Sequence, residues 1–153
     1  MFPSAASSAL SPRAICTGVL GTWLLCCLAC GRALNSKTTE VLTTLGTPAS
    51  FNGGDCTDGQ KMLDVYLEEI GRRPAVSLGK TVPKFAKRAV AVCPMSRPTI
   101  TPGNQVEVSK ISSILGLPNP PQDGTIPLEN WLELTVVHGK VVSLTIVLNR
   151  VPR

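Results

Sequence analysis

The sequence predicts an α+β fold: one helix, at about residues 58–70, packed on a four- to five-stranded antiparallel sheet that ends in a C-terminal hairpin. Two patterns carry this prediction. The segment TDGQKMLDVYLEEIGRR places apolar residues at helical spacing, whereas WLELTVV and VVSLTIVL are alternating, β-branched runs separated by HGK. Residues 56–153 are expected to form a single small domain, because that length suits one hydrophobic core.

An uncharged segment, AICTGVLGTWLLCCLACG at residues 14–31, lies between two arginines near the start of the chain. It is followed by Gly31 and Ala33, which occupy the −3 and −1 positions of a small-x-small cleavage site. A basic flank, an apolar run and such a site are typical of a secretory signal peptide. We therefore expect residues 1–33 to be a signal peptide and the remaining protein to be secreted.

The alternative interpretation is that residues 14–31 stay attached as an uncleaved, single-pass membrane anchor. The run is at the short edge of the roughly 17–25 residues that an α-helix needs to cross a bilayer. In that case the domain would belong to a membrane-tethered accessory protein.

Loss of the signal peptide would leave only two of the six cysteines, Cys56 and Cys93. An even pair in an oxidising compartment predicts one disulfide, whereas two buried thiols are the alternative for a reducing one. The same cleavage would leave 13 basic and 10 acidic residues, a mild excess of positive charge.

The remaining segments give weaker signals. Residues 34–55 are rich in Thr, Ser, Gly and Asn, and we expect a flexible N-terminal lead-in there. Residues 75–79 and 87–93 predict two short strands, since prolines interrupt that stretch, and a further strand begins at Gln105. The apolar face of the helix is expected to pack on the sheet through Met62, Leu63, Tyr66, Leu67 and Ile70.

The register of the C-terminal hairpin follows from its hydrophobic pattern, because a one-residue slip moves every side chain to the other face. A three-residue loop at residues 138–140 pairs Val136 with Val142, Leu134 with Leu144 and Leu132 with Ile146. On this register the outer face of the hairpin carries a candidate apolar partner face: Trp131, Val137, Val141 and Val147. If the loop at residues 118–127 covers that face, these side chains belong to the core instead.

A basic segment with no acidic residue is the main candidate binding feature. Such a patch suits a heparin-like polyanion, an anionic membrane surface or an acidic protein. The alternative is a solvated surface whose charges meet the helix acids Asp64, Glu68 and Glu69. The seven basic residues are Arg72, Arg73, Lys80, Lys84, Lys87, Arg88 and Arg97.

Catalytic motifs are not apparent in the sequence. The single histidine, His138, falls in the predicted hairpin turn, and no nucleophile elbow, zinc-protease pair or phosphate-binding loop occurs. The string NGGDCTDG lacks the ligand pattern of an EF-hand and fits a glycine-rich turn before a helix. We therefore expect no enzyme activity, cofactor or metal site.

These features together predict a secreted, non-enzymatic binding module: an extracellular ligand, inhibitor, effector or complex subunit. Its partner is expected to be another protein, a heparin-like polyanion or an anionic membrane surface. Nucleic acid is not expected, because stacking on bases needs aromatic side chains and only Phe85 lies near the basic segment.

Overall fold

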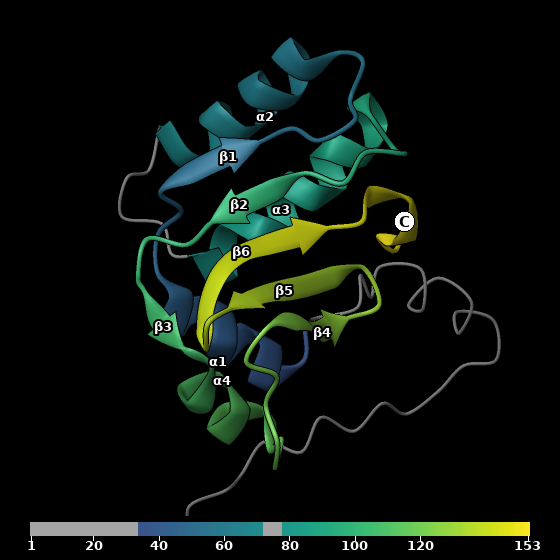
Figure 1. The fold of residues 1–153 in the computed structure, drawn as a ribbon. Helices are drawn as coiled ribbons and strands as arrows, with labels where there is room; N and C mark the ends of the chain where they lie inside the picture. Colours follow the sequence, from purple (N-terminus) through teal and green to yellow (C-terminus); the bar gives the residue numbers. More distant parts are fainter. Residues whose placement is uncertain (1–33, 72–77) are drawn as a thin grey trace, which may run out of the picture. The chain divides into compact units, whose positions relative to one another are not determined.

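The computed structural model describes residues 34–71 and 78–153, which form a mixed α+β fold with an antiparallel sheet (Figure 1). The fold class is as predicted, but this part of the chain contains four α-helices and six strands instead of one helix and four or five strands. In chain order the elements are α1 (Ser36–Leu45), β1 (Ser50–Asn52), α2 (Gly59–Gly71), α3 (Leu78–Val92), β2 (Thr99–Thr101), β3 (Val106–Glu107), α4 (Val108–Leu115), β4 (Gly124–Glu129), β5 (Leu132–Val137), β6 (Lys140–Ile146) and a final 3-10 turn (Leu148–Arg150).

The strands lie in the order β1-β2-β6-β5-β4, and β3 pairs with the start of β6. Side chains alternate between the two faces of a strand, so the sheet has one apolar and one polar face. The polar face includes the cross-strand pairs Thr99–Thr145 and Thr135–Ser143. The apolar face is fully buried at Ile100, Leu132, Leu134, Leu144 and Ile146.

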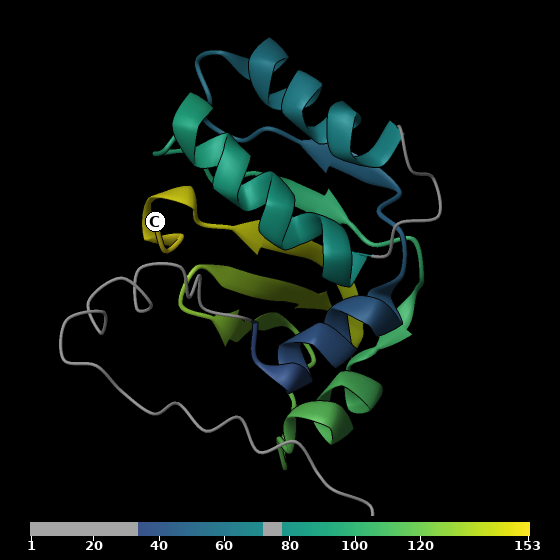
Figure 2. The ribbon, with the colours of Figure 1, turned by 180° about the vertical axis from the view of Figure 1, so that it is seen from behind.

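Helices α1, α2 and α3 cover one face of the sheet, with α3 in the middle (Figure 2). Each helix turns its apolar stripe toward the sheet. The buried members of this layer include Leu42 of α1, Met62 and Tyr66 of α2, and Phe85 of α3, which join the strands in one core cluster. Helix α4 packs beside α1 and β3.

The expected flexible lead-in at residues 34–55 is instead α1 and β1. Val41, Leu42 and Leu45 recur at helical spacing and are fully buried. Asn35 caps the helix, since its Oδ1 accepts a hydrogen bond from the Lys37 N–H at 2.9 Å. The polar composition concealed this short apolar stripe, and burial against the sheet outweighs the weak helix propensity of the threonines.

The strands expected at residues 75–79 and 87–93 are also corrected, because α3 spans Leu78–Val92. Residues 75–77 lie outside the described residues. Val82, Phe85 and Ala89 are buried at a spacing of three and four residues, which is the helical period rather than the alternation of a strand. Pro83 lies inside the helix, where it removes one backbone hydrogen bond, but the buried apolar face on both sides of it sustains the helix.

Two other expectations were partly right. The helix expected at about residues 58–70 is α2, but of its predicted apolar face Leu63 and Leu67 remain 37% and 50% exposed. The strand expected from Gln105 is the two-residue β3, after which the chain turns directly into α4. In both cases the neighbouring elements decide which side of the segment is covered.

The C-terminal hairpin is confirmed as β5 and β6. The pairs Leu132–Ile146 and Leu134–Leu144 are those predicted, but Val136 pairs with Val141 rather than Val142. A β-bulge lies between the pairs Thr135–Ser143 and Val136–Val141, and it leaves one residue of β6, Val142, without a partner in β5. The turn therefore has two residues instead of three. His138 and Gly139 have φ angles of 49° and 73°, the left-handed pair that a type I′ hairpin turn requires.

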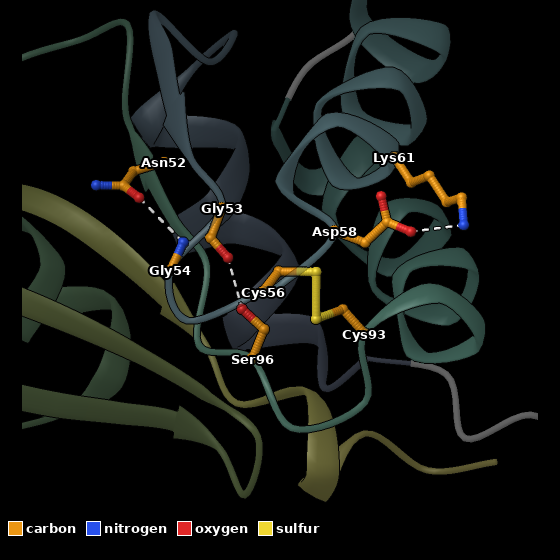
Figure 3. The surroundings of a disulfide bond; sticks show 8 residues. All are labelled: Asn52, Gly53, Gly54, Cys56, Asp58, Lys61, Cys93 and Ser96. Atoms are coloured by element: carbon orange, nitrogen blue, oxygen red, sulfur yellow. Dashed lines mark hydrogen bonds and ion pairs between the residues drawn. A yellow bond between two sulfur atoms is a disulfide. The ribbon is translucent and has the colours of Figure 1, made fainter.

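The start of α2 and the end of α3 are joined by Cys56 and Cys93, whose sulfur atoms lie at disulfide-bonding distance with the Cα atoms 5.7 Å apart (Figure 3). The preceding turn is held by two hydrogen bonds: Gly54 N–H donates to Asn52 Oδ1 at 3.0 Å, and Ser96 Oγ donates to the Gly53 carbonyl at 2.5 Å. The string NGGDCTDG is thus a structural turn.

We predict that the Cys56→Ala/Cys93→Ala double variant loses about 3–4 kcal/mol of unfolding free energy, because its unfolded chain is no longer cross-linked across a 37-residue separation. Urea unfolding followed by tryptophan emission measures this, since Trp131 is the only tryptophan of a chain that begins at Leu34. A reducing agent should destabilise the wild type by a similar amount and leave the double variant unchanged. Equal unfolding free energies of the oxidised wild type and the double variant would contradict the prediction.

Candidate binding surface on α3

Helix α3 has one face in the core and one in solvent. Its outward face carries Lys80, Lys84 and Lys87, all exposed, at positions i, i+4 and i+7. This spacing aligns the three side chains on one side of the helix, over about 10 Å along its axis. The inward face is buried at Leu78, Thr81, Val82, Phe85, Ala86 and Ala89. We call Lys80, Lys84 and Lys87 the lysine stripe.

The lysine stripe is not neutralised locally. Within residues 34–71 and 78–153, none of its three ammonium groups makes an ion pair with a carboxylate. The first turn of α3 contains no acidic residue, although a helix N-terminus favours negative charge. Like charges at these spacings destabilise a helix by about 0.2–0.5 kcal/mol per pair. The arrangement therefore costs local stability instead of adding to it.

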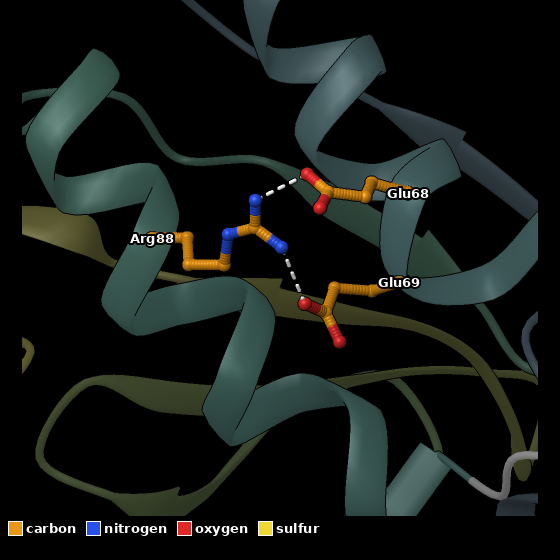
Figure 4. A network of polar contacts seen from close by, with 3 residues as sticks. All are labelled: Glu68, Glu69 and Arg88. Atoms are coloured by element: carbon orange, nitrogen blue, oxygen red, sulfur yellow. Dashed lines mark hydrogen bonds and ion pairs between the residues drawn. The ribbon is translucent and has the colours of Figure 1, made fainter. Parts of the chain in front are cut away.

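Arg88, one residue beyond the stripe, behaves differently (Figure 4). Its Nη1 donates to Glu69 Oε1 at 2.7 Å, and its Nη2 donates to Glu68 Oε2. These hydrogen bonds raise the pKa of Arg88 and join α3 to α2. Two of the three helix acids that the sequence offered as partners for the basic segment are thus bound by this one arginine.

The other basic residues of the predicted patch do not belong to the stripe. Arg97 is exposed in the segment between α3 and β2, where its carbonyl lies against Gly54. Arg72 and Arg73 lie outside the described residues. The structure therefore gathers three of the seven predicted residues on one helix face and engages a fourth, Arg88, in an ion pair.

Two threonines of α1 lie against Gly79, the residue before Lys80, and sequence reasoning missed this neighbour of α3. α1 and α3 approach closely at Gly79, where an added Cβ would lie 3.1 Å from Thr43 Oγ1 and 3.3 Å from the Thr39 carbonyl. Thr39 and Thr43 are exposed, and the residue that they approach, Gly79, directly precedes Lys80 in the chain. Recognising Val41, Leu42 and Leu45 as a helical stripe would have placed these threonines on the outer side of α1.

The candidate apolar partner face of the hairpin is not present. Trp131, Val141 and Val147 are only 7%, 4% and 3% exposed, while Val137 alone remains exposed, at 39%. The bulge in β6 turns Val141 toward the buried side, and the Val147 N–H donates to the Trp131 carbonyl at 2.8 Å. These residues therefore belong mainly to the core.

An aromatic cluster of Phe51, Tyr66 and Phe85 joins β1, α2 and α3. Phe51 stacks on Tyr66 with ring centroids 4.4 Å apart, and Phe85 meets both rings edge-on at 5.4 and 5.8 Å. Such pairs contribute roughly 0.5–1.5 kcal/mol each beyond the area they bury. Burial in this cluster raises the pKa of the Tyr66 hydroxyl, because the phenolate would lose its hydration.

Other features complete the description of the surface. His138 is exposed at the hairpin tip, and its backbone N–H donates to Asp123 Oδ1 at 2.8 Å.

No group of three or more metal-binding side chains occurs in the described part of the chain. No helix within residues 34–71 and 78–153 is long and apolar enough to span a membrane, and the segment at residues 14–31 lies outside them.

Comparison with known proteins gives no relative for this chain. No protein-family model matches it, and no curated protein or solved structure is significantly similar to it.

Tyr66 is the only tyrosine of the chain, so its titration can be followed by ultraviolet absorbance. We predict a pKa above that of free tyrosine, about 10, in the native protein. As the pH rises, the unfolded chain then loses its phenolic proton at a lower pH than the native protein does. The contribution of Tyr66 to the free energy of unfolding is therefore complete below the pKa of free tyrosine. It falls as the pH rises through the native pKa. An ordinary pKa in the folded protein would contradict this account, and the urea-unfolded protein serves as the control.

Proposed function

We propose that this chain is a secreted, non-enzymatic binding module that holds an anionic partner on the lysine stripe of α3. The observation that carries the proposal is a set of three exposed lysines on one face of α3, whose other face is buried; none of them forms an ion pair with a carboxylate among the described residues. Sequences that depart from local stability rules do so most often at functional sites. Here the departure is a row of like charges that no carboxylate within residues 34–71 and 78–153 pairs with.

Neighbouring contacts support a preformed surface. Arg88 donates hydrogen bonds to Glu68 and Glu69 of α2, so these two carboxylates are bound by an arginine that lies outside the stripe. The Cys56–Cys93 link joins α2 and α3 at one end of the pair, and the aromatic cluster joins them in the middle. A surface that is already ordered loses little conformational entropy on binding, which favours affinity.

Secretion is supported by the leader pattern of residues 1–33 and by the pairing of the two cysteines that follow it. If residues 14–31 instead remained as an anchor, the domain would present the same lysine stripe as a membrane-tethered accessory protein. The preference for binding over catalysis rests on the absence of catalytic motifs from the sequence.

The test is a binding panel of three polyanions: heparin, polyglutamate and phosphatidylserine vesicles. We predict that the wild type binds at least one of them at low salt, and that K80A/K84A/K87A loses about tenfold or more of this affinity because the counterion-releasing contacts are gone. The matched control, K37A/K61A/K110A, removes the same charge from exposed lysines outside the stripe and should keep the affinity. Equal loss of affinity in both variants would mean that binding depends only on the net charge of the protein, which would contradict a site on the lysine stripe. A wild type that binds none of the three polyanions would also refute the proposal.

A further inference from the structure

The chemistry around the lysine stripe narrows the class of partner. On one side lies α1 with the exposed hydroxyl-bearing residues Thr39 and Thr43. On the other lies α2, whose nearest acids are bound by Arg88. The surface is therefore hydrophilic on both sides, with lysine as its only free cation among the described residues of α3.

Nucleic acid and membrane surfaces need groups that this surface lacks. Recognition of single-stranded nucleic acid uses exposed aromatic rings, but Phe51, Tyr66 and Phe85 pack against one another in the core cluster. Stable attachment to a bilayer needs apolar side chains beside the basic ones. Glu68 and Glu69 both face Arg88 of α3, and the direction midway between them lies about 150° around α2 from Leu67 and about 170° from Leu63. The exposed Leu63 and Leu67 therefore point away from α3.

A protein partner is also disfavoured by the composition of the stripe. Protein–protein interfaces are enriched in aromatic residues, methionine and arginine, whereas lysine is depleted in them. The one arginine on the outer side of α3, Arg88, is already engaged by two carboxylates. Lysine supplies a flexible, hydrated point charge, which suits an anion that keeps its own hydration.

We infer that the anionic partner proposed above is a sulfated polysaccharide, bound along the axis of α3. Its sulfate groups would accept hydrogen bonds from the ammonium groups of Lys80, Lys84 and Lys87, and the sugar hydroxyls would meet Thr39 and Thr43 of α1. A linear chain matches a stripe that runs about 10 Å along one helix. This inference rests on the proposed function, since it names the partner of the same surface.

The experiment compares heparin, chemically desulfated heparin, polyglutamate and phosphatidylserine vesicles by isothermal titration calorimetry and affinity retention of the full secreted protein. We expect heparin to bind most tightly. Desulfation should weaken binding by about tenfold or more, because it removes the sulfate charges that the lysines contact in the way that basic residues contact phosphates. The slope of log affinity against log salt should fall by about one for each lysine replaced by alanine. The variant K80R/K84R/K87R keeps the charge and should retain most of the binding.

The outcomes separate the two proposals. Tighter binding to polyglutamate or vesicles than to heparin, with loss in K80A/K84A/K87A, would overturn the polysaccharide and keep the lysine stripe as a site for an acidic protein or a membrane. Equal binding of heparin and desulfated heparin would also overturn it. Heparin affinity that survives in K80A/K84A/K87A would overturn both, as would no binding to any polyanion. Circular dichroism of each variant establishes that α3 is intact, and alanine at these exposed helical positions favours the helix.

Discussion

The packing of α3 against the sheet is the constraint on which the rest of the structure depends. Phe85, Ala86 and Ala89 of α3 are fully buried in the same cluster as Ile100 of β2 and Leu144 of β6. Burial of apolar side chains is worth about 25 cal/mol per Å² removed from water, so this face fixes the rotation of the helix about its axis. Once that rotation is fixed, the remaining side of α3 must face solvent, and the lysine stripe lies there.

Helix α2 is secured to α3 by three different interactions. The Cys56–Cys93 link joins the segment before α2 to the residue after α3, Arg88 binds Glu68 and Glu69, and Tyr66 packs against Phe85. Among the residues 59–70 of α2, only Met62 and Tyr66 are deeply buried, so the core alone covers this part of the helix incompletely. The short edge strand β1 covers little of α2. The Cys56–Cys93 link and the ion pairs of Arg88 therefore also hold this helix in place.

The sequence indicated the elements whose pattern is long and regular. The alternation in β5 and β6 and the apolar stripe of α2 were sufficient to place the hairpin and one helix. The bulge was not predictable, because it arises where a two-residue turn and the pairing of Val141 with Val106 of β3 must both be satisfied. Helix α1 was concealed by threonines, one of which, Thr38, donates to Glu129 Oε1 of β4 at 3.0 Å, a contact between distant segments.

The candidate site was predictable in composition but not in geometry. A run of cations without anions was evident along the chain, yet only a helix at residues 78–92 aligns Lys80, Lys84 and Lys87 while directing Arg88 toward α2. In the two strands expected there, Lys84 would have fallen in the connecting loop. The apolar hairpin face failed for a related reason: one bulged residue exchanged the two sides of the sheet near Val141.

The most direct test is the accessibility of single cysteines placed along α3 and labelled with a thiol reagent in the native, disulfide-containing protein. The account predicts rapid labelling of cysteine at Lys80, Lys84 and Lys87, and protection at Val82, Phe85 and Ala89 that is lost in urea. That pattern repeats every three to four residues, as a helix with one buried face requires. Labelling that alternates from one residue to the next would mean a strand in place of α3, and it would contradict both the fold and the lysine stripe.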